Sequence, residues 1–457
     1  MPDGGRIAVY CGDMTVFATA PVTPASVHEV LGHHLLVDGF DMVLDLQASR
    51  GSHLVDARDG TAYLDLFTFF ASSALGMNHP AIAEDAEFTG DLLEAARNKP
   101  SNSDVYTVAM ARFVETFARV LGAPGLPHLF FVEGGALAVE NALKVAFDWK
   151  SRLNSSRGID AAGSKVLHLR EAFHGRSGYT LSLTNTDPVK VDRFPKFDWP
   201  RIASPYLSEG TDAAAREAET LAAARAAFEA HPHDIACFVM EPIQGEGGDH
   251  HFRPQFLQAM QALCHEFDAL FVLDEVQTGC GLTGTAWTFQ QLGVQPDVVA
   301  FGKKTQVCGV MAGGRVDEVP DNVFAVSSRI NSTWGGSLVD MVRARRILEV
   351  MEADGLIARA GVAGEHLLAL LRDLAARHAA VDNVRGRGLM CAFSLPSKEI
   401  RDAVLTSLRE DERVLLLGCG TRSIRFRPAL TVSEDELALG VSALDRVLTA
   451  VLTEKLS

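Results

Sequence analysis

The sequence predicts an α/β fold with a mainly parallel central sheet, and three observations support this prediction. Helical and strand-like patterns alternate through the middle of the 457-residue chain, as they do in α/β proteins. Between about residues 105 and 335 the apolar runs are short and continuous, which is typical of strands covered on both faces. The composition, with 47% apolar and 22% charged residues, is that of a globular protein with a large core.

The pattern divides the chain into three parts. Residues 1–75 mix short apolar runs with turns, and the DG turn in LVDARDGTAYLDLF predicts a hairpin within an N-terminal arm that also contributes to a small domain. Residues 76–338 are expected to form the large domain, and residues 339–457 a smaller C-terminal α/β domain. In the last part SEDE, residues 433–436, is a capping box that predicts the start of the closing helix.

Five apolar runs of the large domain are expected to be its central strands. They lie in HLFFVEGG, KVLHL, IACFVMEP, ALFVLDE and DVVAFGKK. Ligands of such sheets bind beyond the carboxyl ends of the strands. The polar residues that close four of these runs, Glu133, Glu241, Asp274 and Lys303, are therefore placed where we expect a site.

Charge and cysteine content exclude several classes of partner. A net charge of -16 argues against a nucleic acid bound through its phosphates. The seven cysteines are scattered without a CxxC pair, so neither disulfides nor a metal site is expected, and a reducing cytoplasmic setting fits best. The chain contains no 18-residue apolar run, which argues against a membrane span, and Gly12 and Asp13 interrupt the only stretch, RIAVYCGDMTVFATA, that resembles a signal peptide.

The stretch LFFVEGGALAVENALKVAFDW predicts a strand, a glycine turn and a helix whose buried face carries Ala138, Ala142, Val145 and Trp149. Two glycines, Gly134 and Gly135, precede the helix. They allow backbone N–H groups to converge on an anion at the helix N-terminus, which would make a phosphate cradle. Glycine at such a turn is also common for steric reasons, so both interpretations stay open here.

Asp274 and the lysine pair of PDVVAFGKKTQ are the other candidates for chemistry. Asp274 closes an apolar strand and either caps a turn or holds a proton on a heteroaromatic nitrogen. Lys303 follows it 29 residues later, and a partly buried lysine can lose its proton and form a Schiff base. If the backbone is extended here, only one of Lys303 and Lys304 can face the site.

Taken together, VEGG, FHGR, EPIQGEGG, DEVQTG and GK, in this order and spacing, resemble the class III pyridoxal-phosphate aminotransferases of fold type I. The resemblance extends from about residue 40 to 450 and includes NSTWGG, RGRGL and IRFRPAL. It implies that residues 76–338 bind the cofactor. Longer strings such as TFFASSALGMN and FGKKTQVCGVMAG are similar to the branch of the family that transaminates the terminal amine of lysine.

The resemblance implies a role for each residue that matches a family motif. It makes Lys303 the Schiff-base lysine for pyridoxal 5'-phosphate and Asp274 the partner of the pyridine nitrogen. It further assigns Gly135 and Ala136 to the phosphate, Phe173 and Val276 to the two faces of the ring, Gln277 to the phenolic oxygen, and Thr333 to the phosphate of a second subunit in a homodimer. Many family members have a hydroxyl residue at position 136 and an acid at position 137, where this chain has Ala136 and Leu137, so phosphate binding would rely on backbone N–H groups and Thr333. Lys304, alanine in many members, is expected to face away as a structural or solvated neighbour.

Three charged residues are expected to select the substrates. Arg425 matches the arginine that binds an α-carboxylate, and Arg176 resembles a second carboxylate anchor, so that 2-oxoglutarate could be held at both ends. Glu246 resembles a switch that masks Arg425 while an ω-amine is bound, although it could also be a plain turn acid. The expected reaction transfers the ε-amino group of L-lysine to 2-oxoglutarate and gives L-glutamate and 2-aminoadipate 6-semialdehyde, which cyclises to a piperideine carboxylate.

Four alternatives compete with this function. The nearest is another ω-aminotransferase, acting on ornithine or 4-aminobutyrate, and an aminomutase of the same fold is the second. A non-catalytic regulator would carry an appended DNA-binding domain, for which the first 40 residues are too short. A nicotinamide dehydrogenase is disfavoured because QGEGG follows Glu-Pro and does not open a helix within a βαβ unit.

Overall fold

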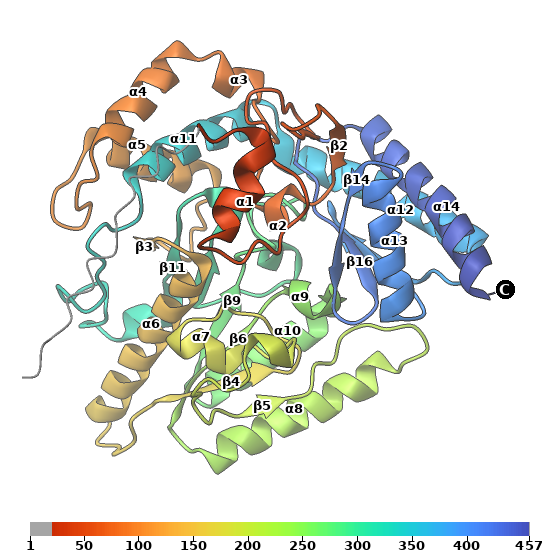
Figure 1. The fold of residues 1–457 in the computed structure, drawn as a ribbon. Helices are drawn as coiled ribbons and strands as arrows, with labels where there is room; N and C mark the ends of the chain where they lie inside the picture. The colour runs from red at the N-terminus through yellow and green to blue at the C-terminus, as the bar shows by residue number, and fades with distance from the viewer. Residues whose placement is uncertain (1–20, 457) are drawn as a thin grey trace, which may run out of the picture.

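The computed structural model describes residues 21–456 of the chain. Its large central sheet has seven strands in the order β3 (His128–Val132), β11 (Cys308–Ala312), β10 (Val298–Phe301), β9 (Leu270–Asp274), β6 (Ile235–Met240), β4 (Lys165–Leu169) and β5 (Arg201–Ile202). All strands run parallel except β11, which pairs antiparallel with both β3 and β10. The predicted mainly parallel sheet and its five predicted strands are confirmed, whereas β5 and β11 were not predicted (Figure 1).

Side chains of the central strands alternate between two separate cores, one on each face of the sheet. Phe238 and Phe271 belong to one core, while their neighbours Val239 and Val272 belong to the other. This explains why these strands are apolar along their whole length rather than at every second residue.

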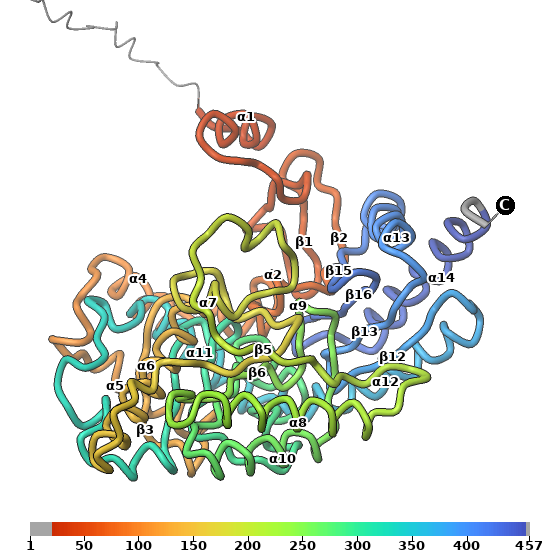
Figure 2. The backbone as a smooth tube through the Cα atoms, turned by 90° about the horizontal axis from the view of Figure 1, so that it is seen from below, coloured from red at the N-terminus to blue at the C-terminus, as the bar shows by residue number. Residues whose placement is uncertain are grey.

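Helices cover both faces of the sheet. The helix α6 (Gly135–Ser156) packs on β10, β11 and β6, and its predicted buried face is confirmed. On the opposite face lies α10 (Pro254–Glu266), which contacts β9 and also α8 (Ala213–Ala230). Figure 2 shows α8 and α10 on one side of β5 and β6, with α7 (Gly178–Leu183) on the other. A sheet enclosed in this way leaves the strand ends as the place for a ligand.

Three helices flank the sheet beside β3 and β11. They are α4 (Ala86–Arg97), α5 (Val108–Val120) and α11 (Leu338–Ala353), and α11 packs on both others. The chain before residue 254 also contains shorter elements: α1 (Val27–Gly32), α2 (Thr68–Ala71), α3 (Pro80–Ala83), the strands β7 (Ile243–Gln244) and β8 (His250–His251), and the turn α9 (Gly245–Gly248).

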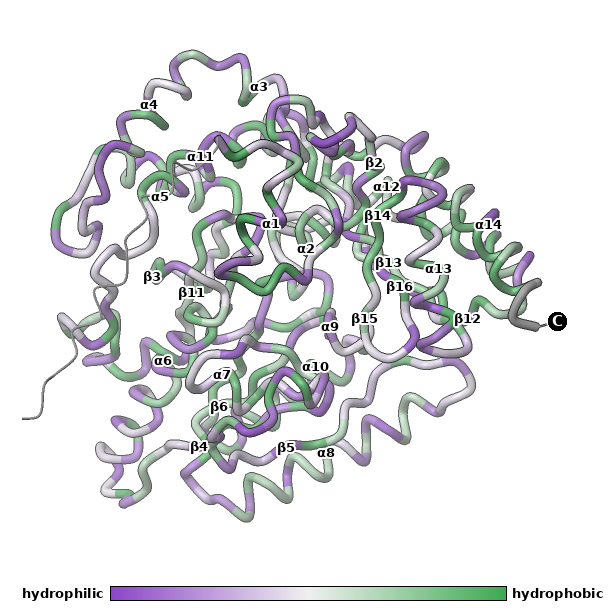
Figure 3. The backbone as a smooth tube through the Cα atoms, in the orientation of Figure 1, coloured by the Kyte–Doolittle hydropathy of each residue, from purple (hydrophilic) through white to green (hydrophobic). Residues whose placement is uncertain are grey.

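The C-terminal part contains a four-stranded antiparallel sheet in the order β12 (Asp382–Arg387), β13 (Met390–Ser394), β16 (Ser423–Phe426) and β15 (Leu417–Cys419). The helices α12 (Leu356–Arg377) and α13 (Lys398–Glu410) contact this sheet, and α14 (Glu434–Leu456) packs on both helices. Figure 3 shows polar and apolar residues alternating along α14. The predicted capping box is confirmed, because the Ser433 hydroxyl accepts from the Glu436 N–H and the Glu436 carboxylate accepts from the Ser433 N–H.

The N-terminal strands join the C-terminal part. The predicted hairpin is confirmed as β1 (His53–Val55) and β2 (Ala62–Asp65), paired antiparallel. β2 also pairs in parallel with β14 (Val414–Leu415), so a segment of the N-terminal part and one of the C-terminal part share a sheet. The expected arm, 1–75, lies here from residue 21 onward, whereas the stretch RIAVYCGDMTVFATA, with Cys11 and Asp13, lies outside the described residues.

Within residues 21–456, no helix is long and apolar enough to cross a membrane. The same range contains six cysteines, all buried and free, and holds no group of three His, Cys, Asp or Glu side chains arranged for a metal ion.

Candidate active site

A cavity of about 940 Å³ lies at the carboxyl ends of β6, β9 and β10. Its lining includes most of the predicted site residues: Gly135, Ala136, Phe173, Glu246, Asp274, Val276, Gln277 and Lys303. Glu133 does not line it and pairs with Lys99 at 3.2 Å, with 40% of its side chain exposed. The cavity therefore lies where ligands of such sheets bind, beyond the strand ends, but Glu133, which also follows a strand, does not line it.

Lys303 is the first residue after the Gly302 that follows β10, and it begins the short 3-10 turn Lys303–Thr305. Its φ of 55° lies in the left-handed region, which side chains with a Cβ seldom adopt, and such outliers cluster at functional sites. Burial, together with the positive charges of Arg425 and Arg427, lowers the pKa of Lys303 to about 8. A lysine with this pKa is available as a neutral amine near neutral pH.

Lys304 points away from the cavity, as expected, but the backbone is not extended here. Its amine donates a hydrogen bond to the Ala71 carbonyl at 2.8 Å, and the residue is only 1% exposed. Burial lowers the pKa of Lys304 to about 7. Of the two roles left open for this lysine, the geometry supports the structural one and excludes the solvated one.

Asp274 is fixed by a residue that the sequence reasoning missed. Its Oδ2 accepts a hydrogen bond from Nδ1 of His174 at 2.8 Å, and its Oδ1 accepts from the Val276 N–H at 3.1 Å. Burial lowers the pKa of His174, but the hydrogen bond and negative charge of Asp274 outweigh it, so the net pKa is raised. His174 directly follows Phe173 in FHGR, and that adjacency was the only signal in the sequence.

Glu241 joins the two loops that carry Phe173 and Glu246. One carboxylate oxygen accepts from the Phe173 N–H at 3.0 Å, and the other accepts from the Gly245 N–H at 3.2 Å. Burial raises the pKa of Glu241 to about 8. The Glu241 carboxylate thus connects the two loops within the cavity wall.

The glycine turn before α6 has the geometry of an anion cradle. Gly134 has φ 101°, which favours glycine, and α6 begins at Gly135. A Cβ on Gly135 would lie 3.0 Å from Val276 Cγ1, so the backbone approaches the cavity closely there. The N–H groups of the first helical turn have no partner within the helix and suit a phosphate.

Gln277 is held by a buried ion pair that the sequence reasoning also missed. Its side-chain oxygen accepts a hydrogen bond from Arg427 Nε at 2.9 Å, and Arg427 pairs with Asp249 through Nη1 and Nη2. This ordering leaves the amide nitrogen of Gln277 available as a donor in the cavity. Arg427 lies in IRFRPAL, two residues after Arg425, but its partner lies in another part of the chain.

Arg425 and Glu246 form the predicted pair, with Arg425 Nη2 2.8 Å from Glu246 Oε2. Arg425 is 2% exposed, and its Nε and Nη1 have no hydrogen-bond partner among the described residues. Burial would raise the pKa of Glu246, but Arg425 and Lys190 lower it below its usual range. The guanidinium therefore keeps donors free beside an ionised carboxylate.

Besides the buried Arg425, two other predicted residues do not line the cavity. Arg176 and Thr333 are exposed and do not line it. The Thr333 carbonyl accepts hydrogen bonds from the Ser101 and Ser103 hydroxyls, which hold the segment while its side chain faces outward. The roles of Arg176 and Thr333 stay predictions.

The residues that line the cavity fit pyridoxal 5'-phosphate. A buried carboxylate, Asp274, can pair with a protonated ring nitrogen, and the turn at Gly134 and Gly135 can take the phosphate. Phe173 and Val276 supply apolar surface between them, and Lys303 supplies an amine of lowered pKa. Each part of that cofactor therefore finds a matching group here.

Comparison with known proteins agrees with this geometry. Residues 37–448 match the family model "Aminotransferase class-III". L-lysine-epsilon aminotransferase of Mycobacterium tuberculosis is 67% identical over 439 residues, covering 95% of this chain and 98% of the relative. Mitochondrial 4-aminobutyrate aminotransferase of Homo sapiens is 30% identical over 440 residues, covering 88% and 84%. The solved structure of lysine aminotransferase from M. tuberculosis in the internal aldimine form superposes with a TM-score of 0.93 at 67% identity, covering 94% of this chain and 100% of that one. The chain belongs to the class III aminotransferases, which have fold type I and use pyridoxal phosphate.

Proposed function

We propose that the protein transfers the ε-amino group of L-lysine to 2-oxoglutarate, giving 2-aminoadipate 6-semialdehyde and L-glutamate. An ω-amine substrate is supported by the Arg425 guanidinium, which is buried beside the cavity and paired with Glu246. Lysine as the amine is supported by 67% identity to a relative named L-lysine-epsilon aminotransferase, against 30% to one named for 4-aminobutyrate.

When bound, pyridoxal phosphate supplies a carbonyl that condenses with amines and a ring that acts as an electron sink. Lys303 Nζ takes the proton from the substrate carbon that bears the amino group and gives it to the cofactor carbon that receives the amino group. Its pKa of about 8 lets it do both near neutral pH. Asp274, oriented by His174, would pair with the protonated ring nitrogen of the cofactor.

The Glu246 carboxylate accommodates two substrates of different charge in one place. An ω-amine presents an uncharged chain next to Arg425, and the pair with Glu246 keeps that buried cation neutralised. With 2-oxoglutarate, the α-carboxylate takes the place of Glu246 on the guanidinium, whose planar fork suits two parallel hydrogen bonds. Arg176 is proposed to hold the second carboxylate.

A homodimer with shared sites is part of the proposal, as is a cytoplasmic location, where free cysteines stay reduced. The exposed Thr333 on a held segment supports donation to a second copy. Mixing Lys303→Ala and Thr333→Ala subunits tests this, because one site of each mixed dimer would have both residues intact. Recovery above the mean of the two parents supports shared sites, and no recovery opposes them.

The function is tested by single-turnover absorbance of the cofactor-loaded enzyme with L-lysine, ornithine and 4-aminobutyrate, followed by addition of 2-oxoglutarate. The expected result is the fastest conversion with lysine and formation of glutamate in the second half. Faster conversion of ornithine or 4-aminobutyrate would contradict the proposed donor. Turnover without 2-oxoglutarate would point to an aminomutase instead.

A further inference from the structure

Glu246 has a second cationic partner outside the active-site cavity. Its Oε2 faces Arg425 while its Oε1 accepts a hydrogen bond from Lys190 Nζ. Lys190 ends the short turn Pro188–Lys190 in the loop between α7 and β5, and its amine also lies 5.8 Å from the centre of the Phe173 ring. One carboxylate thus bridges a buried guanidinium and an amine whose side chain is 28% exposed.

The backbone of Glu246 is fixed, so the carboxylate can leave Arg425 only by side-chain rotation. The Glu246 carbonyl accepts from the Gly420 N–H at 2.9 Å. A Cβ on Gly247 would lie 2.1 Å from the Glu171 carbonyl oxygen, and one on Gly245 would lie 2.5 Å from Gln277 Oε1, so this turn is packed on both sides.

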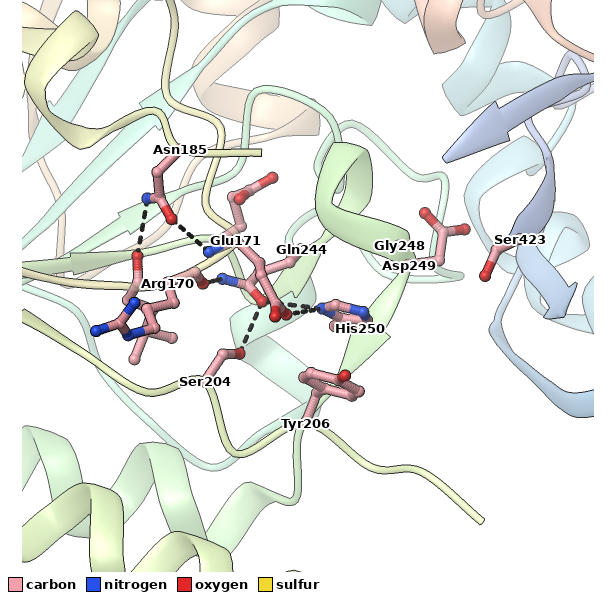
Figure 4. A network of polar contacts seen from close by, with 12 residues as sticks. Arg170, Glu171, Asn185, Ser204, Tyr206, Gln244, Gly248, Asp249, His250 and Ser423 are labelled. Atoms are coloured by element: carbon pink, nitrogen blue, oxygen red, sulfur yellow. Dashed lines mark hydrogen bonds and ion pairs between the residues drawn. The ribbon is translucent and has the colours of Figure 1, made fainter. Parts of the chain in front are cut away.

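The residues that flank the turn are anchored as well. Figure 4 shows Gln244 donating to the Arg170 carbonyl, at 2.8 Å, and accepting from Ser204 and His250. His250 in turn stacks on Tyr206. The network holds residues 244 and 250 on either side of the turn. The Glu246 side chain can therefore rotate while the backbone of the turn stays in place.

Space for that rotation exists on the side of Lys190. A lateral cavity of about 780 Å³ lies next to the active-site cavity, and Glu246 lines both. Lys190 lines only the lateral one. When the carboxylate turns away from Arg425, the lateral cavity gives it both room and a positive charge.

We propose that Lys190 is a positioning residue that holds Glu246 after it leaves Arg425, and so favours the state that binds 2-oxoglutarate. This rests on the proposed function, in which the two substrates need Glu246 in different positions. In the masked state Arg425 and Lys190 share the carboxylate, whereas after release Lys190 is the partner that remains, so loss of Lys190 costs the released state more and favours the masked one. Lys190 therefore sets the balance between the two half-reactions without touching a substrate.

The test compares Lys190→Met, which keeps the hydrocarbon stem, with Lys190→Arg, which keeps the charge. Lys196→Met is the matched control, because Lys196 lies in the same loop and donates to the Val191 carbonyl rather than to Glu246. An ion pair of this exposure changes an equilibrium by about three- to fivefold. Lys190→Met should weaken the 2-oxoglutarate half-reaction by that factor, through its apparent dissociation constant, and leave the lysine half-reaction unchanged or faster, while Lys190→Arg restores both.

Two further measurements separate this inference from the proposed function. Glutarate is a dicarboxylate that cannot react, so its binding can be measured by calorimetry whatever the amino donor is. Its affinity should fall by about three- to fivefold in Lys190→Met, because one exposed ion pair is lost. In a Glu246→Gln background Lys190→Met should have no additional effect, because Lys190 acts through that carboxylate. Equal losses in both half-reactions, a loss confined to lysine, additive effects with Glu246→Gln, or the same change in Lys196→Met would each overturn the inference. Failure of the wild-type protein to consume lysine would instead overturn the proposed function.

Discussion

Nδ1 of His174 lies 2.8 Å from Oδ2 of Asp274, and both side chains are almost completely buried. A carboxylate can only accept, so Nδ1 is the donor. The contact fixes the orientation of the acid that is proposed to pair with the cofactor ring.

Replacing His174 should therefore weaken cofactor binding and turnover together. Loss of one charge-assisted hydrogen bond costs about 1.5–3 kcal/mol, so His174→Leu should lower both by about 10- to 100-fold. His174→Asn, which keeps an N–H donor near the same place, should recover part of the loss. Cofactor affinity measured by fluorescence titration, with thermal unfolding as a check on folding, decides this, and unchanged affinity in His174→Leu would refute it.

Covalent attachment of the cofactor should distinguish the two neighbouring lysines. Borohydride reduction of the loaded protein, followed by peptide mass spectrometry, should place the label on Lys303 and none on Lys304, because only Lys303 lines the cavity. Lys303→Ala should lose both the label and turnover, and its visible absorption should change. Lys304→Met should keep the label, and a label on Lys304 in the wild-type protein would reverse the assignment.

The buried Lys304 should give the protein a stability that rises with pH. Its pKa of about 7 in the folded protein lies below the ordinary 10.5, so between these values the unfolded chain holds a proton that the folded chain has lost. Unfolding free energy then increases through this window by up to about 1.4 kcal/mol per pH unit for one such group, and this contribution stops below pH 7. Lys304→Met should make the rise shallower in denaturant titrations, whereas the exposed Lys196→Met should not. A slope identical to the wild type in Lys304→Met would contradict the assignment.

Removing the buried guanidinium should harm the two half-reactions unequally. Arg425→Ala deletes the proposed carboxylate site, and truncation of a buried, hydrogen-bonded charge costs at least about 30-fold. The 2-oxoglutarate half-reaction should fall by that factor and the lysine half-reaction by much less. Equal losses in single-turnover assays would rule out a carboxylate role specific to 2-oxoglutarate.

Neutralising Glu246 should slow the lysine half-reaction more than the 2-oxoglutarate half-reaction. Glu246→Gln leaves Arg425 as an unpaired buried cation beside the bound chain of lysine, which should slow the lysine half-reaction by about tenfold. Binding of 2-oxoglutarate should be unchanged or tighter, because no carboxylate competes for the guanidinium. Stopped-flow measurement of both halves tests this, and a slower 2-oxoglutarate half-reaction alone would contradict it.

The sequence by itself determined the features that depend on neighbouring residues. The five apolar runs, the glycine turn before α6, the hairpin and the capping box at Ser433 are local patterns, and the structure contains each of them. Strand β11 escaped prediction because its short run CGVMA contains a glycine and one β-branched residue, which is a weak strand pattern, and β5 escaped because it has two residues. Asp274 and Lys303 each follow an apolar run, which placed each at a strand end, and the structure pairs the two strands side by side.

Tertiary structure alone decided which side chains meet across the sheet. His174 and Asp274 are 100 residues apart, Arg427 and Asp249 are 178 apart, and Lys304 meets the Ala71 carbonyl over 233 residues. No short pattern encodes such pairs, because they depend on strand order and on how the C-terminal sheet packs against the large one. The bridge from Lys190 through Glu246 to Arg425 belongs to this class: it joins three segments whose proximity arises only when the whole chain is folded.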